Sequence, residues 1–145
     1  MKSCTFFGHK FTPVQIKPIL YNKIIELIRD ENVRNFYIGN EGAFDRIARE
    51  CLEEIKKTYP IKYTIVLAYV DKIKRESQRS LNETNSIFPD ELLKVPPKFA
   101  ISRRNYWMVK NSDYVITYVT HIGGGAATFK ELAEKKKRIV YNIAE

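Results

Sequence analysis

Three consecutive glycines, Gly123, Gly124 and Gly125, precede Ala126 and Thr128 at the predicted junction of a strand and a helix. Glycine has no Cβ, so the backbone can approach an anion closely, and the free N–H groups at a helix start attract negative charge. The Thr128 hydroxyl can donate a further hydrogen bond. The pattern predicts a phosphate-binding loop, with a tight turn that binds nothing as the alternative.

A second candidate segment follows the first predicted strand and contains Gly8, His9 and Lys10. The missing Cβ of Gly8 would let a ligand approach the chain, and Lys10 would contact a phosphate as a point charge. His9 could hydrogen-bond a ligand or take part in acid–base chemistry, since histidine titrates near neutral pH. A structural polar role for His9 is the alternative, because the sequence shows no carboxylate partner for it.

Glycine recurs after the second predicted strand, in a segment whose candidate ligand-binding residues are Gly39, Asn40, Glu41 and Gly42. Asp45 then lies in the first turn of the next predicted helix. A carboxylate there either complements the positive end of the helix dipole or accepts a hydrogen bond from a ribose hydroxyl, as acidic residues do in dinucleotide-binding folds. Both interpretations of Asp45 remain open at the level of sequence.

Two adjacent arginines, Arg103 and Arg104, lie early in the helix predicted at 101–111. A guanidinium group can hold a phosphate through two parallel hydrogen bonds. Positive charge at a helix start gains nothing from the helix dipole, which favours a functional role over surface solubility. We therefore expect these arginines, and Arg104 above all, to bind the phosphate of a ligand.

Hydrophobic periodicity divides the chain into alternating strands and helices. Strands are predicted at 3–7, 33–38, 61–70, 114–119 and 138–143, and helices at about 12–28, 44–55, 101–111 and from the glycine loop to 136. Thr12 is the expected N-cap of the first helix, with Pro18 marking a kink or its true start. This alternation indicates one Rossmann-like α/β domain over residues 1–145. We expect a three-layer sandwich with a mostly parallel sheet of about five strands and helices on both faces.

In open parallel sheets, ligands bind outside the carboxyl ends of the strands, where the strand order reverses. The three glycine segments all follow strands, so they should converge on one edge of the sheet. The longest irregular stretch, at 71–88, is rich in charged and polar residues. Loops of this length inside a compact domain are usually functional or mobile.

The net charge of +8 attracts anionic partners, which include both nucleotides and nucleic acid. The basic residues are scattered apart from a short run at 135–138. Such a run near a helix C-terminus complements the helix dipole and needs no partner. The charge therefore does not separate a small anionic ligand from DNA.

Several features favour a cytoplasmic protein without membrane contact. Residues 1–9 lack the apolar run of a signal peptide, and the longest apolar stretch, at 65–70, is too short to cross a bilayer. Cys4 and Cys51 have no metal-ligand spacing and are expected in the core as reduced residues. We expect no metal site and no bound cofactor.

The segments described above resemble the SLOG superfamily, the Rossmann-like group that contains DprA and the LOG phosphoribohydrolases. The resemblance spans nearly the whole chain and is greatest to small, single-domain bacterial SLOG proteins. It rests on Phe-Phe-Gly-His at 6–9, Tyr-x-Gly-Asn-x-Gly at 37–42, and similar stretches at 95–101, 103–108 and 112–116. Members of the superfamily bind nucleotides or nucleotide-derived ligands, some as enzymes and some as sensors, so the resemblance implies a nucleotide-like ligand here.

LOG enzymes cleave the N-glycosidic bond of nucleoside 5′-monophosphates, and Arg104, Met108, Thr128 and Glu131 match positions of their signature. The resemblance implies catalytic roles for two of these residues. Arg104 would orient the substrate, and Glu131 would stabilise the oxocarbenium-like ribosyl centre or activate water.

Three positions depart from the LOG signature: Asn105 replaces its lysine, Gly123 its proline and Ala127 its last glycine. Phosphate binding is compatible with these changes, whereas the specific LOG hydrolysis depends on the replaced residues. The leading hypothesis is a binder of a nucleotide or ADP-ribose-type ligand, with hydrolysis of a glycosidic bond as a further expectation. The alternatives are a DprA-like module for single-stranded DNA and a non-catalytic nucleotide sensor, and analogy with other small Rossmann-like domains implies a homodimer.

Overall fold

The computed structural model describes residues 2–69 and 85–144. Within these residues the centre of the molecule is a six-stranded sheet in which neighbouring strands are parallel. The strands are β1 (Lys2–Gly8), β2 (Val33–Ile38), β3 (Lys62–Val66), β4 (Ser86–Ile87), β5 (Tyr114–Tyr118) and β6 (Ile139–Asn142), in the spatial order β4-β3-β2-β1-β5-β6. The inner strands β1, β3 and β5 are largely buried on both faces, as is typical of parallel sheets.

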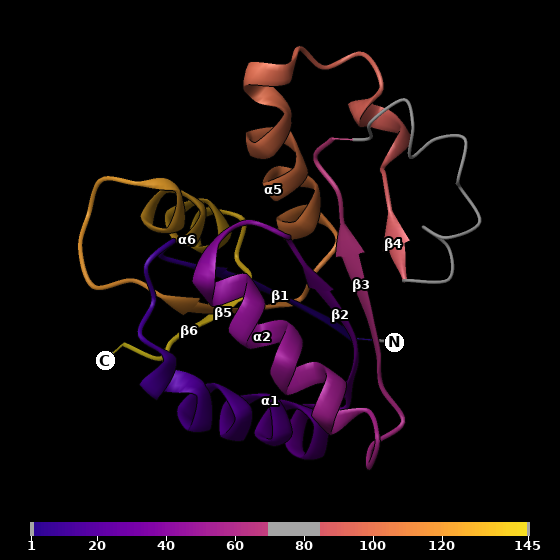
Figure 1. Ribbon diagram of the computed structural model, residues 1–145, viewed down its shortest axis with the longest axis vertical. Coiled ribbons are helices and arrows are strands. Elements are labelled where there is room, and N and C mark those ends of the chain that lie inside the picture. Colours follow the sequence, from indigo (N-terminus) through magenta and orange to yellow (C-terminus); the bar gives the residue numbers. More distant parts are fainter. Residues whose placement is uncertain (1, 70–84, 145) are drawn as a thin grey trace.

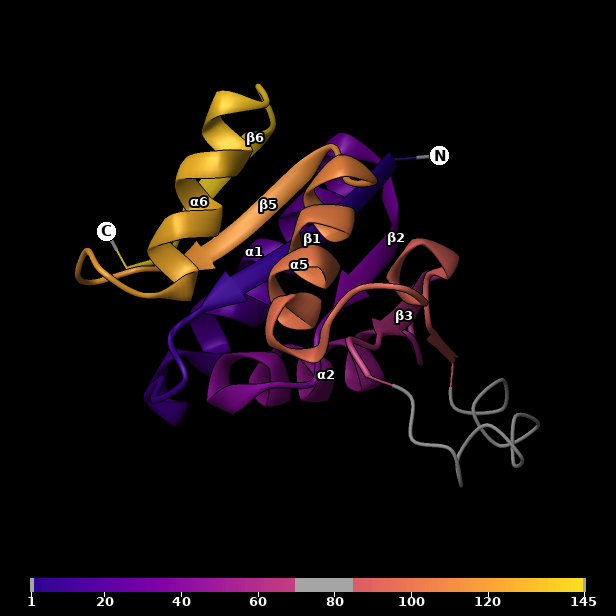
Figure 2. The same ribbon diagram turned by 90° about the horizontal axis from the view of Figure 1, so that it is seen from above.

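Helices cover both faces of the sheet and form the outer layers (Figures 1 and 2). The helices α1 (Lys17–Glu31) and α2 (Gly42–Ile55) pack together on one face, and α5 (Ala100–Lys110) and α6 (Gly125–Lys135) on the other. The short 3₁₀ turns are η1 (Val14–Ile16), η2 (Asp90–Leu92) and η3 (Pro97–Phe99).

Alternation along β1 divides the core between the two faces of the sheet. Phe6 packs in the larger hydrophobic cluster with residues of α1 and α2 such as Ile24 and Ile47. Phe7 points to the other face and packs in a smaller cluster with Met108 and Val109 of α5. Because successive side chains of a strand point to opposite faces, one strand anchors both outer layers.

The strand order reverses at β1, since the chain places β2 and β3 on one side of it and β5 and β6 on the other. Gly8 at the end of β1 pairs with Tyr118 at the end of β5, and β2 runs parallel to β1 on the opposite side. The carboxyl ends of these strands therefore meet at one edge, where the loops diverge and ligands bind in folds of this kind.

The Rossmann-like α/β sandwich expected from the sequence is confirmed, with six strands instead of about five. The additional strand β4 has only two residues, which is too short for any hydrophobic period to reveal. It is held to β3 by backbone hydrogen bonds of 2.8 Å from the Ile65 N–H to the Asn85 carbonyl and from the Leu67 N–H to the Ile87 carbonyl.

Strand β3 ends at Val66, four residues earlier than the apolar run to residue 70 predicts. The chain leaves the sheet beyond this point, and the Tyr69 hydroxyl donates a hydrogen bond of 2.8 Å to the Pro97 carbonyl outside the sheet. An apolar run indicates burial, and here part of it is buried beyond the end of the strand, as at Ala68.

The start of the first helix also differs from the prediction. Thr12 does not cap the helix, because its Oγ1 donates to the carbonyl of His9 at 2.5 Å and closes the turn after β1. The turn η1 follows, and α1 begins at Lys17 with Pro18 in its first turn. Proline is tolerated there, since the N–H that it lacks would have no partner within the helix.

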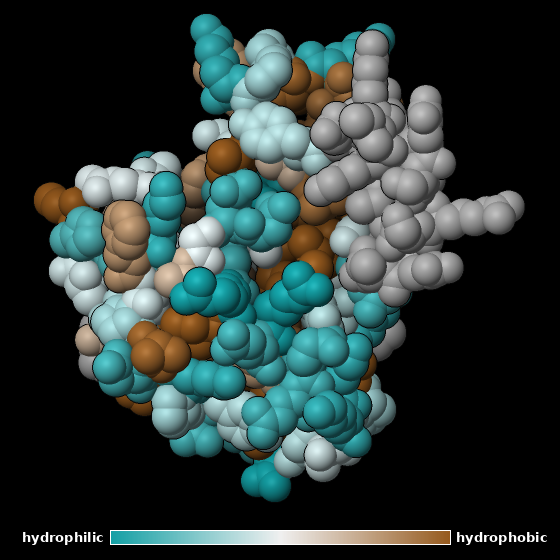
Figure 3. Space-filling view, in the orientation of Figure 1, coloured by the Kyte–Doolittle hydropathy of each residue, from teal (hydrophilic) through white to brown (hydrophobic). Residues whose placement is uncertain are grey.

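Most of the predicted loop at 71–88 lies outside the described residues, and residues 86–87 form β4. Within residues 2–69 and 85–144, no helix combines the length and apolarity needed to cross a bilayer. The surface over α1 and α2 is mainly hydrophilic, with small apolar areas (Figure 3).

Candidate ligand-binding crevice

A cavity of about 660 Å³ opens at the carboxyl ends of β1, β2 and β5, where the strand order reverses. We call this cavity the crevice; its volume is in the range that encloses a small organic ligand. The residues of the crevice that the sequence singled out are Gly8, His9, Lys10, Glu41, Gly42, Asp45, Arg104, Gly124, Gly125 and Ala126.

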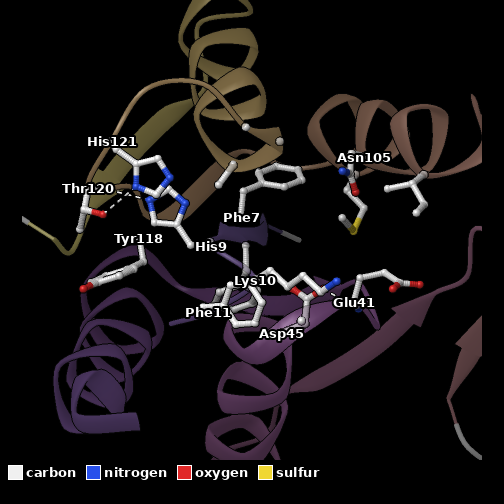
Figure 4. Close-up of a pocket in the computed structure, with 18 of the residues that line it drawn as sticks. Phe7, His9, Lys10, Phe11, Glu41, Asp45, Asn105, Tyr118, Thr120 and His121 are labelled. Atoms are coloured by element: carbon white, nitrogen blue, oxygen red, sulfur yellow. Dashed lines mark hydrogen bonds between the residues drawn. The ribbon is translucent and has the colours of Figure 1, made fainter. Parts of the chain in front are cut away.

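Figure 4 shows how the side chains divide the crevice. One end contains the imidazoles of His9 and His121 and the phenol of Tyr118, at the ends of β1 and β5. The other end contains the side chains of Glu41, Asp45 and Asn105, at the start of α2 and in α5. Between the two ends lie Lys10 and Phe11, from the loop after β1, and Phe7 of β1 itself.

Two stacked imidazole rings form the end of the crevice between β1 and β5. The ring centroids of His9 and His121 are 3.9 Å apart, with 10° between the ring planes. The Thr120 N–H donates to His9 Nε2 at 2.8 Å, so this nitrogen carries no proton. Burial lowers the pKa of His9, and His121 lowers it further by charge. The pair ties the loop after β1 to the loop after β5 with His9 in its neutral form.

The glycine loop approaches the crevice at the N-terminus of α6. Gly124 and Gly125 line the crevice together with Ala126, and the φ values of Gly123 and Gly124 are +82° and +144°, a region that favours glycine. A Cβ on any of the three glycines would meet no atom within 4 Å, so packing does not require glycine here. The Thr128 Oγ1 donates to the Gly124 carbonyl at 2.9 Å, which fixes the loop from outside the crevice lining.

Arg104 of α5 lies at the floor of the crevice and is only 2% exposed. Its Nε donates to Asn105 Oδ1 at 2.7 Å, and one terminal nitrogen, NH1, donates to Asn40 Oδ1 at 3.2 Å and to the Val66 carbonyl at 3.0 Å. Asn105, which stands where LOG enzymes have lysine, therefore orients the guanidinium. Neutral acceptors from α5, β3 and the loop after β2 hold this cation in place.

No carboxylate of the described residues forms an ion pair with Arg104. Burial lowers the pKa of the guanidinium, while the more distant carboxylates of Asp45 and Glu41 raise it. A charge that is taken out of water without a direct counter-ion costs free energy. The arrangement therefore leaves a buried positive charge beside an open cavity.

Asp45 of α2 lies across Gly39 from this guanidinium. A Cβ on Gly39 would lie 2.7 Å from Asp45 Oδ2 and 3.0 Å from Arg104 Cζ, so only glycine fits between them. The Glu41 N–H donates to Asp45 Oδ2 at 3.0 Å. Burial raises the pKa of Asp45 to about 6, although the Glu41 N–H and the charge of Arg104 both act to lower it.

This pKa predicts how stability depends on pH. Because the pKa of Asp45 rises from its ordinary 3.8 to about 6 on folding, the folded protein keeps a proton that the unfolded chain loses between these values. The free energy of unfolding should therefore fall as pH rises from about 4 to 6. Urea unfolding from pH 4 to 7 should show this fall in the wild type but not in the Asp45→Asn variant. The stability of the variant relative to the wild type should therefore rise with pH.

The exposed Asp30 of α1 supplies a matched control for this experiment. The Asp30→Asn variant should follow the pH dependence of the wild type. Parallel curves for the wild type and the Asp45→Asn variant would contradict the assignment of the pH-dependent term to Asp45.

The remaining predicted residues lie outside the crevice lining or have packing roles. Arg103 is exposed, and Glu131 lies on the exposed surface of α6, where it pairs with Lys135 at 3.4 Å. Gly8 lines the crevice, but it also makes room for Phe44, because a Cβ there would lie 2.1 Å from the ring.

Several residues that line the crevice were assigned no role from the sequence, among them Phe11, Tyr118 and His121. His121 and Tyr118 are at the end of β5 as His9 is at the end of β1, so position after a strand was the available signal. Their contact with His9 depends on β1 and β5 being neighbours, which no local pattern specifies. Among the described residues, no group of three or more His, Cys, Asp or Glu side chains could hold a metal ion.

The parallel sheet, the reversal of strand order at β1 and the glycine-lined crevice define a Rossmann-like protein of the SLOG superfamily. Residues 4–144 match the YspA SLOG family, and the chain therefore belongs to this family. No curated protein matches the chain significantly.

Proposed function

We propose that this protein binds a nucleotide or nucleotide-derived ligand in the crevice, with a phosphate group directed towards Arg104 and the N-terminus of α6. The observation that carries the proposal is the buried Arg104 guanidinium, which lines the crevice without an ion pair from the described carboxylates. A phosphate would supply the missing negative charge and accept a charge-assisted hydrogen bond from the guanidinium.

Two further features of the crevice support an anionic ligand. The free N–H groups at the start of α6 lie beside Gly124 and Gly125, where the dipole of the helix favours negative charge. Lys10 adds an exposed ammonium group to the same lining. Family membership is compatible with a nucleotide-related role.

A thermal-shift screen tests the proposal directly. The panel contains nucleoside mono-, di- and triphosphates, ADP-ribose, NAD and cyclic dinucleotides, with inorganic phosphate as the control. A ligand at about 100 times its Kd should add about 2.7 kcal/mol to the free energy of unfolding, which corresponds to a rise in Tm of several degrees. Shifts no larger than that of inorganic phosphate across the whole panel would contradict a nucleotide site.

Hydrolysis of an N-glycosidic bond is a finer proposal for the same site, and chromatography of the same mixtures for released base tests it. The resemblance to LOG enzymes implies Glu131 as the catalytic carboxylate, whereas Glu131 lies outside the lining. The carboxylate that combines a place in the crevice with a pKa near neutrality is Asp45, and such a group suits acid–base catalysis. We therefore propose Asp45 rather than Glu131 for this role.

The basic run at the end of α6 favours a small ligand over DNA. Lys135 pairs with Glu131, and Arg138 donates to the carbonyls of Val109 and Lys110, so two of its four cations are already engaged within the protein. Binding to single-stranded DNA, tested by gel shift at two salt concentrations, is the alternative. A homodimer and a cytoplasmic location remain part of the proposal.

A further inference from the structure

Phe11, in the loop after β1, is an aromatic ring placed between two hollows of the surface. It lines the crevice and also a neighbouring groove of about 710 Å³. The residue is 88% exposed. Figure 4 shows it beside Lys10 in the middle of the crevice, between the imidazole end and the carboxylate end.

The backbone on either side of Phe11 is anchored, so its exposure is built into the fold. The carbonyl of Lys10 accepts a hydrogen bond of 2.9 Å from the Ala43 N–H at the start of α2. On the other side, Thr12 is buried and its hydroxyl donates to the carbonyl of His9. Gly42 closes the contact, since a Cβ there would lie 3.0 Å from the Cα of Lys10.

The surroundings of the ring suit a planar, anionic ligand. The ammonium nitrogen of Lys10 lies 5.9 Å from the centre of the Phe11 ring, and Arg104 lines the same crevice. Aromatic rings stack on nucleobases of every kind, because every base presents a π-face, and nearby cations strengthen binding of the attached phosphate. Because the backbone that carries the ring is anchored, the loop itself loses little conformational entropy when a ligand binds.

We propose that Phe11 stacks on the base of the nucleotide whose phosphate the crevice holds, and so makes the site specific for ligands that carry a base. The inference rests on the proposed function and deepens it, because phosphate binding alone would not require Phe11. An exposed aromatic ring that served a protein interface would instead be covered by a second copy of the chain.

Affinities of four nucleoside monophosphates and of ribose 5-phosphate, measured by isothermal titration calorimetry, separate base recognition from phosphate recognition. The Phe11→Ala and Phe11→Leu variants should weaken binding of AMP and GMP at least about fivefold, as expected for loss of base stacking. Binding of CMP and UMP should weaken less, and binding of ribose 5-phosphate should change less than about twofold. The Phe11→Tyr variant, which keeps the ring, should bind all of them like the wild type.

Phe99 provides a matched control, because it is also exposed, at 50%, and also lies beside a lysine, with Lys98 Nζ 5.1 Å from its ring centre. Phe99 does not line the crevice or the neighbouring groove. The Phe99→Ala variant should therefore leave every affinity unchanged, and an equal loss in both alanine variants would contradict a specific role for Phe11.

The outcomes distinguish this inference from the proposed function. Wild-type protein that binds ribose 5-phosphate as tightly as AMP would retain the phosphate site and overturn base stacking. Unchanged affinity for AMP in Phe11→Ala, or full affinity in Phe11→Leu, would also overturn it. Conversion of a dimer to a monomer by Phe11→Ala in sedimentation, with no change in nucleotide affinity, would assign the ring to a protein interface. A wild-type protein that bound neither AMP nor ribose 5-phosphate would overturn both proposals.

Discussion

Replacing Arg104 by alanine is expected to weaken binding of the best nucleotide in the screen by at least about 30-fold. The reason is that a charged hydrogen-bonding partner in a desolvated site typically contributes about 2–5 kcal/mol to binding, and each 1.4 kcal/mol is a factor of about ten in Kd. Arg104 is 2% exposed and lines the crevice, so its charge acts on a ligand through little intervening water. Isothermal titration calorimetry measures the loss directly.

The preceding residue provides the matched control. Arg103 has the same side chain one position earlier on α5, but it is exposed and does not line the crevice. The Arg103→Ala variant should change the affinity less than about twofold, since exposed charges contribute little. The Arg104→Lys variant keeps the charge but loses the planar fork, and we expect an intermediate affinity.

Circular dichroism and the Tm of each variant show whether the fold survives removal of the buried guanidinium. A folded Arg104→Ala protein that binds as tightly as the wild type would overturn the role assigned to Arg104. Equal losses in Arg103→Ala and Arg104→Ala would instead indicate a general effect of net charge.

Replacing Gly8 by alanine is expected to lower the free energy of unfolding by about 3 kcal/mol or more, at the upper end of the costs of overpacking. A Cβ at Gly8 would lie 2.1, 2.4 and 2.6 Å from three carbons of Phe44, which is 1% exposed. One of these carbons is the Cβ of Phe44 itself, so turning the buried ring cannot relieve the overlap and the strand or α2 must shift. Urea unfolding measures the loss, and a fall in Tm of roughly 10 °C should accompany it.

Gly125 is the control for this substitution, because a Cβ there would meet no atom within 4 Å and its φ is not positive. The Gly125→Ala variant should change stability by about 1 kcal/mol at most, with either sign. Removing the ring with Phe44→Ala should make Gly8→Ala less costly than in the wild type, so the double variant should lose less than the sum of the two single losses. Additive losses would show that Phe44 is not the cause.

Residue patterns alone predicted the class of fold and the edge of the sheet at which the crevice lies. The apolar runs at 33–38 and 114–119 and the amphipathic pattern at 44–55 carry their own period, because side chains alternate in a strand and repeat every 3.6 residues in a helix. Glycine after a strand indicated where the chain turns. These are local properties, so β2, β5 and α2 have nearly the predicted bounds.

Only the tertiary structure decided which residues meet at that edge. The stacking of His9 on His121, the contact of Arg104 with Asn40, and the two-residue strand β4 join segments from different parts of the chain. Strand order brings these segments together, and a local period contains no information about strand order.

The glycines show the same division between sequence and tertiary structure. The sequence predicted that Gly8 and Gly39 lie at the ends of strands, where a missing Cβ allows close approach. The structure shows what approaches them: Phe44 fills the space at Gly8, and Asp45 and Arg104 fill the space at Gly39. The sequence by itself determined where the backbone needs room, and packing between distant residues determined what occupies that room, because close packing leaves space for only one arrangement of these side chains.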